Sequence, residues 1–153
     1  MTSTYNDIYS RFLMKIKDYD FFSQTEADAN ESMHGWLTAS LSKPYINRIF
    51  ASISADDEIA ELEYTLSDKV NDFSDKNFVE ELLGYQMIYE WLSPKVNTTT
   101  LLNQMITNSK EQRFFAQANQ LAQMRELLAD SENKVRSMLR DKGYMYNSYL
   151  GNV

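Results

Sequence analysis

The sequence predicts a mainly α-helical (all-α) protein: a single-domain helical bundle over residues 1–143 with a long C-terminal helix, then an extended tail at 144–153. Only four glycines and two prolines occur in 153 residues, which favours long helices over many short strands and turns. Hydrophobic residues make up 43% and aromatic residues 13% of the chain, as is typical of a globular domain. In most segments the apolar residues recur at helical spacing.

The most apolar stretch, residues 78–91, is predicted to be the central core helix. Its sequence is FVEELLGYQMIYEW, and a helix that is apolar nearly all round is normally buried on several sides. Ser74 and Asp75 precede it as capping residues, and two glutamates fall near its positive end. We expect Pro94 to end this helix, because proline lacks the amide hydrogen and clashes with the preceding turn.

Two helices are predicted on the N-terminal side of this core helix. The first covers residues 5–17 and starts from a Thr4 cap, and the second starts from a Thr25 cap. Each threonine is followed three residues later by an aspartate, a spacing that resembles a capping box. Pro44 breaks or redirects the second helix and is followed by a short helical turn.

Within residues 51–73, a short β segment is predicted near residues 59–67. Leu62, Tyr64 and Leu66 alternate with polar residues, a period of two that favours a strand. No adjacent hairpin partner is evident in the sequence. A lone strand leaves unpaired backbone groups, so we expect an intersubunit strand that pairs with another chain or with the C-terminal tail. A helix or an extended surface loop is the alternative for this segment.

Two further helices are predicted after Pro94. Asn97 caps a short amphipathic helix that ends near residue 106, and a long helix follows over residues 110–142 until Gly143 ends it. The second half of the long helix is strongly charged and carries one narrow apolar seam with near-heptad spacing. We therefore expect this helix to project from the body or to line an interface between subunits.

The C-terminal tail is unusually rich in aromatic residues for a chain end, which would normally be polar. Aromatic anchors give a large contact area at a modest loss of side-chain entropy, which is typical of a docking peptide. We expect docking on another protein, with folding back on the tail's own domain as the alternative. The residues predicted to make this contact are Tyr144, Met145, Tyr146, Tyr149 and Leu150.

The composition argues against several classes of function. A net charge of -7 disfavours a nucleic-acid binder that neutralises phosphates, and the charged residues of 130–142 alternate in sign, which indicates a solvated helix face. The chain has no cysteine and one histidine, His34, so the residues needed for a Ser-His or Cys-His catalytic pair or for a zinc site are almost absent. We expect no enzyme activity, no metal and no cofactor, and no stretch reaches membrane-spanning length. Three acidic pairs could be imagined as metal ligands but suit caps and solvated faces as well: Asp56 with Asp57, Glu61 with Glu63, and Glu80 with Glu81.

Four strings, spread over most of the chain, together resemble a known protein family. They are DIYSRFLMKIKDYDF at 7–21, EWLSPKVNTTTLLNQM at 90–105, FFAQANQLAQMREL at 114–127 and RDKGYMYNSYLG at 140–151. The set resembles small head–tail connector (adaptor or neck) proteins of long-tailed bacteriophages and prophages of Gram-positive bacteria. None of the strings is a catalytic motif.

The resemblance implies a structural virion protein of the neck, assembled in the host cytoplasm. Adaptors of this class are helical and form a homo-oligomeric ring, usually a dodecamer, beneath the portal protein. They extend the DNA channel without sequence-specific binding, contact the next neck protein (a stopper) or a tail component, and reach into the portal with C-terminal segments. The alternatives are another neck or tail-completion protein of the stopper or tail-terminator layer, and a non-virion helical binding module.

Overall fold

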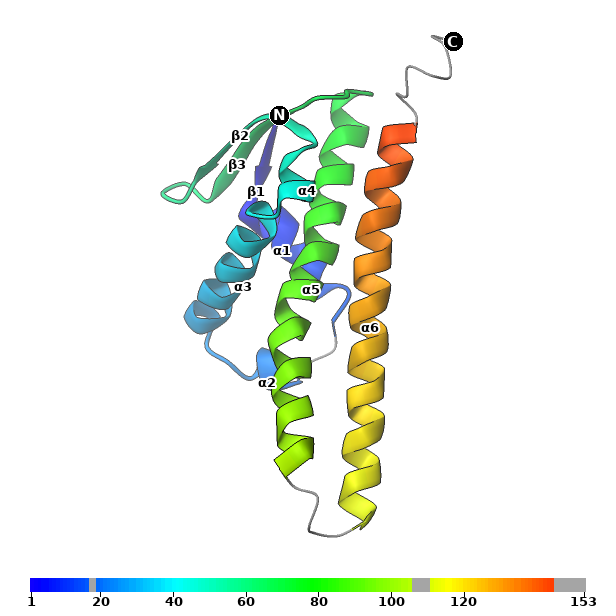
Figure 1. The fold of residues 1–153 in the computed structure, drawn as a ribbon. Helices are drawn as coiled ribbons and strands as arrows, with labels where there is room; N and C mark the ends of the chain where they lie inside the picture. Colours follow the sequence, from blue (N-terminus) through cyan, green and yellow to red (C-terminus); the bar gives the residue numbers. More distant parts are fainter. Residues whose placement is uncertain (17–18, 106–110, 145–153) are drawn as a thin grey trace.

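The computed structural model describes residues 1–16, 19–105 and 111–144. The chain forms a mainly helical body with one small sheet (Figure 1). In chain order the elements are β1 (Thr2–Thr4), α1 (Tyr5–Leu13), α2 (Tyr19–Phe22), α3 (Glu26–Leu41), α4 (Pro44–Asn47), β2 (Phe50–Asp56), β3 (Glu61–Leu66), α5 (Asp72–Met105) and α6 (Glu111–Tyr144).

The apolar stretch predicted as the core helix lies in α5, and the prediction of its central position is confirmed. Helix α5 packs against α1, α3 and α6, and in Figure 1 the long helices α5 and α6 lie side by side. Burial on several sides removes most of its apolar surface from water, which is the main driving force of folding. The buried apolar side chains of this stretch are Val79, Leu82, Leu83, Met87, Ile88 and Trp91.

The predicted ends of α5 were wrong on both sides. The helix starts at Asp72, where the side chain of Asn71 accepts a hydrogen bond of 2.8 Å from the Ser74 amide. It continues through Pro94 to Met105, so the short helix predicted from Asn97 is its C-terminal part. Leu92 and Val96 are buried on either side of the proline, and this packing offsets the missing backbone hydrogen bond.

The N-terminal helices start as predicted. The Thr4 hydroxyl accepts a hydrogen bond of 3.1 Å from the Asp7 amide at the start of α1, and Thr25 caps α3 in the same way. Helix α1 ends at Leu13, before the predicted end at 17. The Lys15 ammonium donates to the Arg11 carbonyl oxygen at 2.9 Å and so satisfies one of the last helical acceptors.

The predicted strand exists as β3, but its predicted partners were wrong. The sheet has the order β1-β3-β2 and both pairings are antiparallel, so β3 is the central strand and has no free edge for another chain. Its alternating side chains face the core of the same chain, because hydrophobic burial fixes which face points inward. Those buried side chains are Leu62, Tyr64 and Leu66.

The last helix was predicted over residues 110–142 and is observed as α6 over Glu111–Tyr144, so its extent was predicted almost correctly. Gly143 lies inside α6, which runs one residue further to Tyr144. Val135 and Ser131 are buried and Leu128 packs against the core, so α6 packs along α5 instead of projecting from the body. The C-terminal end of α6 lies at the same end of the molecule as the start of α5 (Figure 1).

Candidate functional site

A buried ion pair fixes the C-terminal end of α6 to the start of α5. The Lys142 ammonium contacts the Asp75 carboxylate and also lies 4.9 Å from the centre of the Phe78 ring. The Asp75 carboxylate also accepts a hydrogen bond of 2.9 Å from the Val70 amide. The Asp75 side chain is 1% exposed and that of Lys142 is 11% exposed. The last turn of α6, after which residues 145–153 follow, is therefore fixed to the body.

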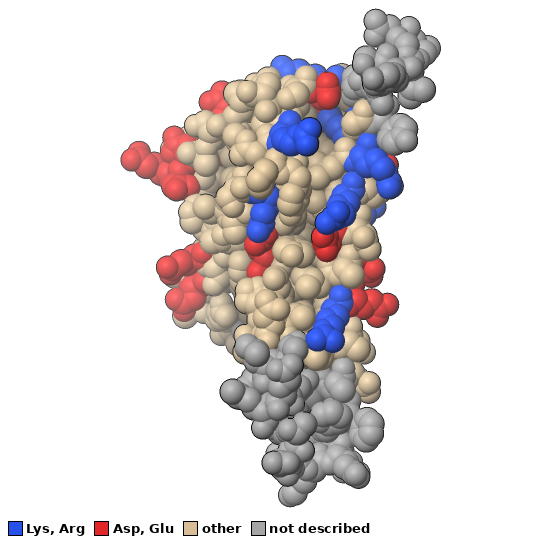
Figure 2. All heavy atoms as spheres, viewed as in Figure 1, with Lys and Arg blue, Asp and Glu red and all other residues tan. Residues whose placement is uncertain are grey.

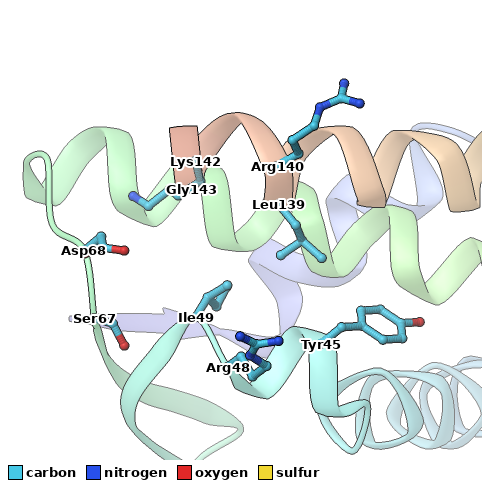
Figure 3. Close-up of a pocket in the computed structure, with 9 residues that line it drawn as sticks. All are labelled: Tyr45, Arg48, Ile49, Ser67, Asp68, Leu139, Arg140, Lys142 and Gly143. Carbon is cyan, nitrogen blue, oxygen red and sulfur yellow. The ribbon is translucent and has the colours of Figure 1, made fainter. Parts of the chain in front are cut away.

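Beside this ion pair lies a pocket of about 360 Å³, between α4, the segment after β3 and the end of α6 (Figure 3). Ile49 and Leu139 give it an apolar floor. Arg48 lies at its edge, whereas the guanidinium of Arg140 points away from it. The site thus combines an apolar surface with an excess of basic side chains over its one carboxylate, that of Asp68, which suits a partner that carries an apolar side chain beside a carboxylate.

A second pocket of about 250 Å³ adjoins the first and shares Tyr45 and Leu139 with it. The Tyr45 hydroxyl donates a hydrogen bond of 3.1 Å to the Gln86 side chain. Burial raises the pKa of Tyr45 above its ordinary value, so the hydroxyl keeps its proton to a higher pH than a free tyrosine does. Tyr45 is therefore fixed between the two pockets as a half-exposed ring.

Charge is unevenly distributed over the molecule. Figure 2 shows most of the visible lysine and arginine side chains over the upper part of one face, and acidic side chains along the left edge. Comparison with Figure 1 places the acidic edge over α3 and the β2–β3 hairpin, and the basic region around α4 and the end of α6. Arg48, Arg136 and Arg140 are exposed members of the basic region.

The acidic hairpin turn is tied to the helices beneath it. The Tyr5 hydroxyl donates a hydrogen bond of 2.6 Å to Asp57, and His34 Nε2 lies 3.8 Å from the same carboxylate. Burial, followed by the bond to Asp57, raises the pKa of Tyr5, so this tyrosine stays protonated and keeps its donor role. His34 packs against the Tyr5 ring at 5.6 Å and belongs to this anchor.

Two of the three carboxylate pairs considered as metal ligands have structural partners, Asp56 with Asp57 and Glu80 with Glu81. Glu80 is buried and accepts hydrogen bonds from Ser3 at 3.1 Å and Arg11 at 3.3 Å. Glu81 pairs with Lys15 at 2.9 Å. Within residues 1–16, 19–105 and 111–144, no group of three or more His, Asp or Glu side chains is placed to hold a metal ion.

The structure describes only some of the predicted site residues. Leu62, Tyr64 and Leu66 are core residues of β3, so the predicted intersubunit strand was wrong. Tyr144 is the last residue of α6. The remaining predicted tail contacts lie outside the described residues: Met145, Tyr146, Tyr149 and Leu150.

Sequence reasoning missed the pocket and the ion pair. Asp75 was interpreted only as a cap and Lys142 only as part of a solvated helix face, and 67 positions separate them along the chain. No local pattern indicates such a pairing. Tyr45 and Arg48 appear in the sequence as an ordinary short helix, and they line a pocket only because the end of α6 lies across from them in the fold.

Comparisons with known proteins identify no relative. No family model, no curated protein and no solved structure matches this chain. Among the described residues, no helix combines the length and the apolar character needed to cross a membrane.

Proposed function

We propose that this chain is a structural head–tail connector of the adaptor type, which forms a ring beneath a phage portal protein and links the capsid to the tail. In this role it is a virion component of the neck, it extends the DNA channel, and it has no catalytic activity. Its partners are further copies of itself, the portal protein, and the next neck protein or a tail component.

The observation that carries this proposal is the fixed position of the end of α6. The buried pair of Lys142 with Asp75 holds this end against the body, so the tyrosine-rich residues 145–153 continue from a defined point. A docking segment that starts from a rigid body loses less conformational entropy on binding than one that starts from a mobile helix end. The resemblance of the sequence to connector proteins supports the same role.

The net charge of the chain is consistent with this role, whereas the buried Glu80 carboxylate has a structural task. The net charge of -7 suits a channel component that DNA must pass without being retained. The buried carboxylate of Glu80 is used in hydrogen bonds that tie strand β1 and helix α1 to α5. This bonding stabilises the fold.

The test is binding to the portal protein encoded by the same phage. The full chain and a chain that ends at Tyr144 are each mixed with purified portal and separated by sedimentation. We expect the full chain to sediment with portal and the shortened chain to remain in the supernatant. The circular dichroism spectrum of the shortened chain should show unchanged helix content. Replacement of Tyr149 by alanine in the full chain is expected to weaken binding without loss of the fold.

Equal portal binding by the full and shortened chains would contradict docking through the tail. A full chain that does not bind portal but binds the tail tube or tail terminator would place the protein in another layer of the neck. A monomer that binds neither and is missing from purified virions would favour a binding module outside the particle.

A further inference from the structure

The β2–β3 hairpin presents an acidic tip with one exposed apolar side chain. Between residues 49 and 68 the chain has no lysine or arginine. At the tip, Glu58 is exposed and Ile59 is 63% exposed, which is unusual for isoleucine in a packed domain. The tip therefore offers a carboxylate next to an apolar anchor.

This tip is held in one conformation. The Asp56 carboxylate accepts hydrogen bonds from the amides of Glu58 at 3.0 Å and Ile59 at 3.4 Å. The Tyr5 amide donates to the carbonyl oxygen of Ala60 at 2.9 Å, and Ala60 has a φ of 54°. Because these contacts already order the turn, little conformational entropy remains to be lost when a partner binds it.

The pocket beneath α6 has the complementary chemistry. Its floor is formed by Ile49 and Leu139, and Arg48 lies at its edge (Figure 3). The lining holds three basic side chains, of Arg48, Arg140 and Lys142, against one acidic side chain, that of Asp68. Among the described residues Arg48 has no ion-pair partner, whereas Lys142 is bound to Asp75. The pocket of about 360 Å³ is large enough for an isoleucine side chain with its neighbouring carboxylate.

The tip of one chain lies far from the pocket of the same chain. Strand β2 begins at Phe50, next to the pocket residue Ile49, and its seven residues lead away to the tip. At about 3.3 Å per residue, the tip lies about 20 Å from the pocket. In Figure 1 the hairpin extends to one edge of the molecule and α6 forms the opposite edge. A contact between tip and pocket therefore needs a second copy.

We propose that the hairpin tip of one copy docks in the pocket of the next, with Ile59 on the apolar floor and Glu58 beside Arg48. The two surfaces are different, so the contact is head-to-tail and leads to a ring where the rotation closes. The contact deepens the proposed function, because it names the surfaces between neighbouring copies of the ring, and it is testable without portal.

The first test uses cysteine cross-linking, because the chain has no cysteine of its own. Ile59→Cys is placed in an untagged chain and Ser67→Cys, at the pocket wall, in a chain with a mass tag. Under mild oxidation we expect the mixture to give the mixed disulfide dimer and each variant alone to give at least tenfold less. Asn119→Cys, exposed and distant along α6, is the matched control in place of Ser67→Cys.

The second test reverses the charges at the contact. Glu58→Arg and Arg48→Glu are each expected to weaken self-association about tenfold at low salt, measured by sedimentation over a range of concentrations. The double variant, with both signs reversed in one chain, should recover to within about twofold, because the pair again attracts. High salt should reduce all of these differences.

Three results would overturn the proposal. One is a wild-type chain that remains a 17.9 kDa monomer at every concentration and gives no mixed disulfide. Another is cross-linking of Ile59→Cys to itself, which would show a symmetric contact instead. The third is loss of duplex DNA binding in Arg48→Glu with unchanged self-association, which would make the pocket a DNA surface. None of these experiments contains portal, so their failure is distinct from failure of the portal test.

Discussion

Replacement of Lys142 by methionine tests whether the end of α6 is held by its buried ion pair. Methionine keeps an apolar side chain of similar length over the Phe78 ring but removes the ammonium. The Asp75 carboxylate is then left 1% exposed with the Val70 amide as its remaining hydrogen-bond donor among the described residues. Breaking a buried pair in this way typically costs about 3–5 kcal/mol.

The measurement is the free energy of unfolding from urea titration followed by circular dichroism at the helical band. Arg136→Met is the matched control, because it removes a basic residue from the same helix but breaks a pair with Glu132 whose side chains are 72% and 43% exposed. Such exposed pairs contribute little to stability, because water and salt screen them. We therefore expect Lys142→Met to destabilise the protein several times more than Arg136→Met.

The partner variant Asp75→Asn separates the charge pair from packing. Lys142 lies in the last turn of α6 and can move its ammonium toward water, so we expect a smaller loss of about 1–3 kcal/mol. The double variant should cost less than the sum of the two single variants, because no buried charge is left unpaired. A Lys142→Met loss within about 1 kcal/mol of the Arg136→Met control would refute the role of this pair.

Three further predictions concern the core. Trp91→Ala, at a side chain 8% exposed, should lower the free energy of unfolding by about 3–5 kcal/mol, and a loss below about 1 kcal/mol in urea titration would contradict the central position of α5. Gly84→Ala should destabilise the protein by about 1–3 kcal/mol, since the new Cβ would lie 2.9 Å from Arg11 Cβ in α1. Gly35→Ala is the control: its new Cβ meets nothing within 4 Å, so this variant should be neutral or stabilising. Burial and then the charge of Asp57 raise the pKa of Tyr9 from 10.0 to about 12. The contribution of Tyr9 to stability is therefore complete below pH 10 and is lost toward pH 12. Thermal melts between pH 9 and 12 check this, and an unchanged melting temperature would contradict it.

The helices were largely predictable because their signals are local. The Thr4 and Thr25 caps are each set by a residue three positions away, and the apolar density of 78–91 is enough to indicate burial in α5. The ends of the helices were less predictable. Pro94 normally ends a helix, and the packing that offsets it comes from residues elsewhere in the chain.

The sheet was only half predictable. Alternation in β3 indicates a strand, but β2 has no clear alternation because most of its side chains are exposed, so the hairpin was not evident. Strand β1 has three residues, and it pairs with β3 across a separation of about 60 positions. Pairing over such a distance depends on tertiary packing, which a single sequence does not show.

The candidate site depended even more on tertiary structure. Lys142 meets Asp75 because α6 packs along α5, and Lys142 and Arg48 line the same pocket although they lie far apart in the sequence. The tail was noticeable in sequence because aromatic residues are unusual at a chain end, and its predicted docking remains a prediction.

The mass of the complex with purified portal protein is the decisive measurement. Native mass spectrometry of portal mixed with an excess of the full chain is expected to show one ring of copies bound per portal, and free portal with the chain that ends at Tyr144. Portal that keeps its own mass in the presence of the full chain, or that gains the same mass from both chains, would contradict a connector that docks through its C-terminal segment.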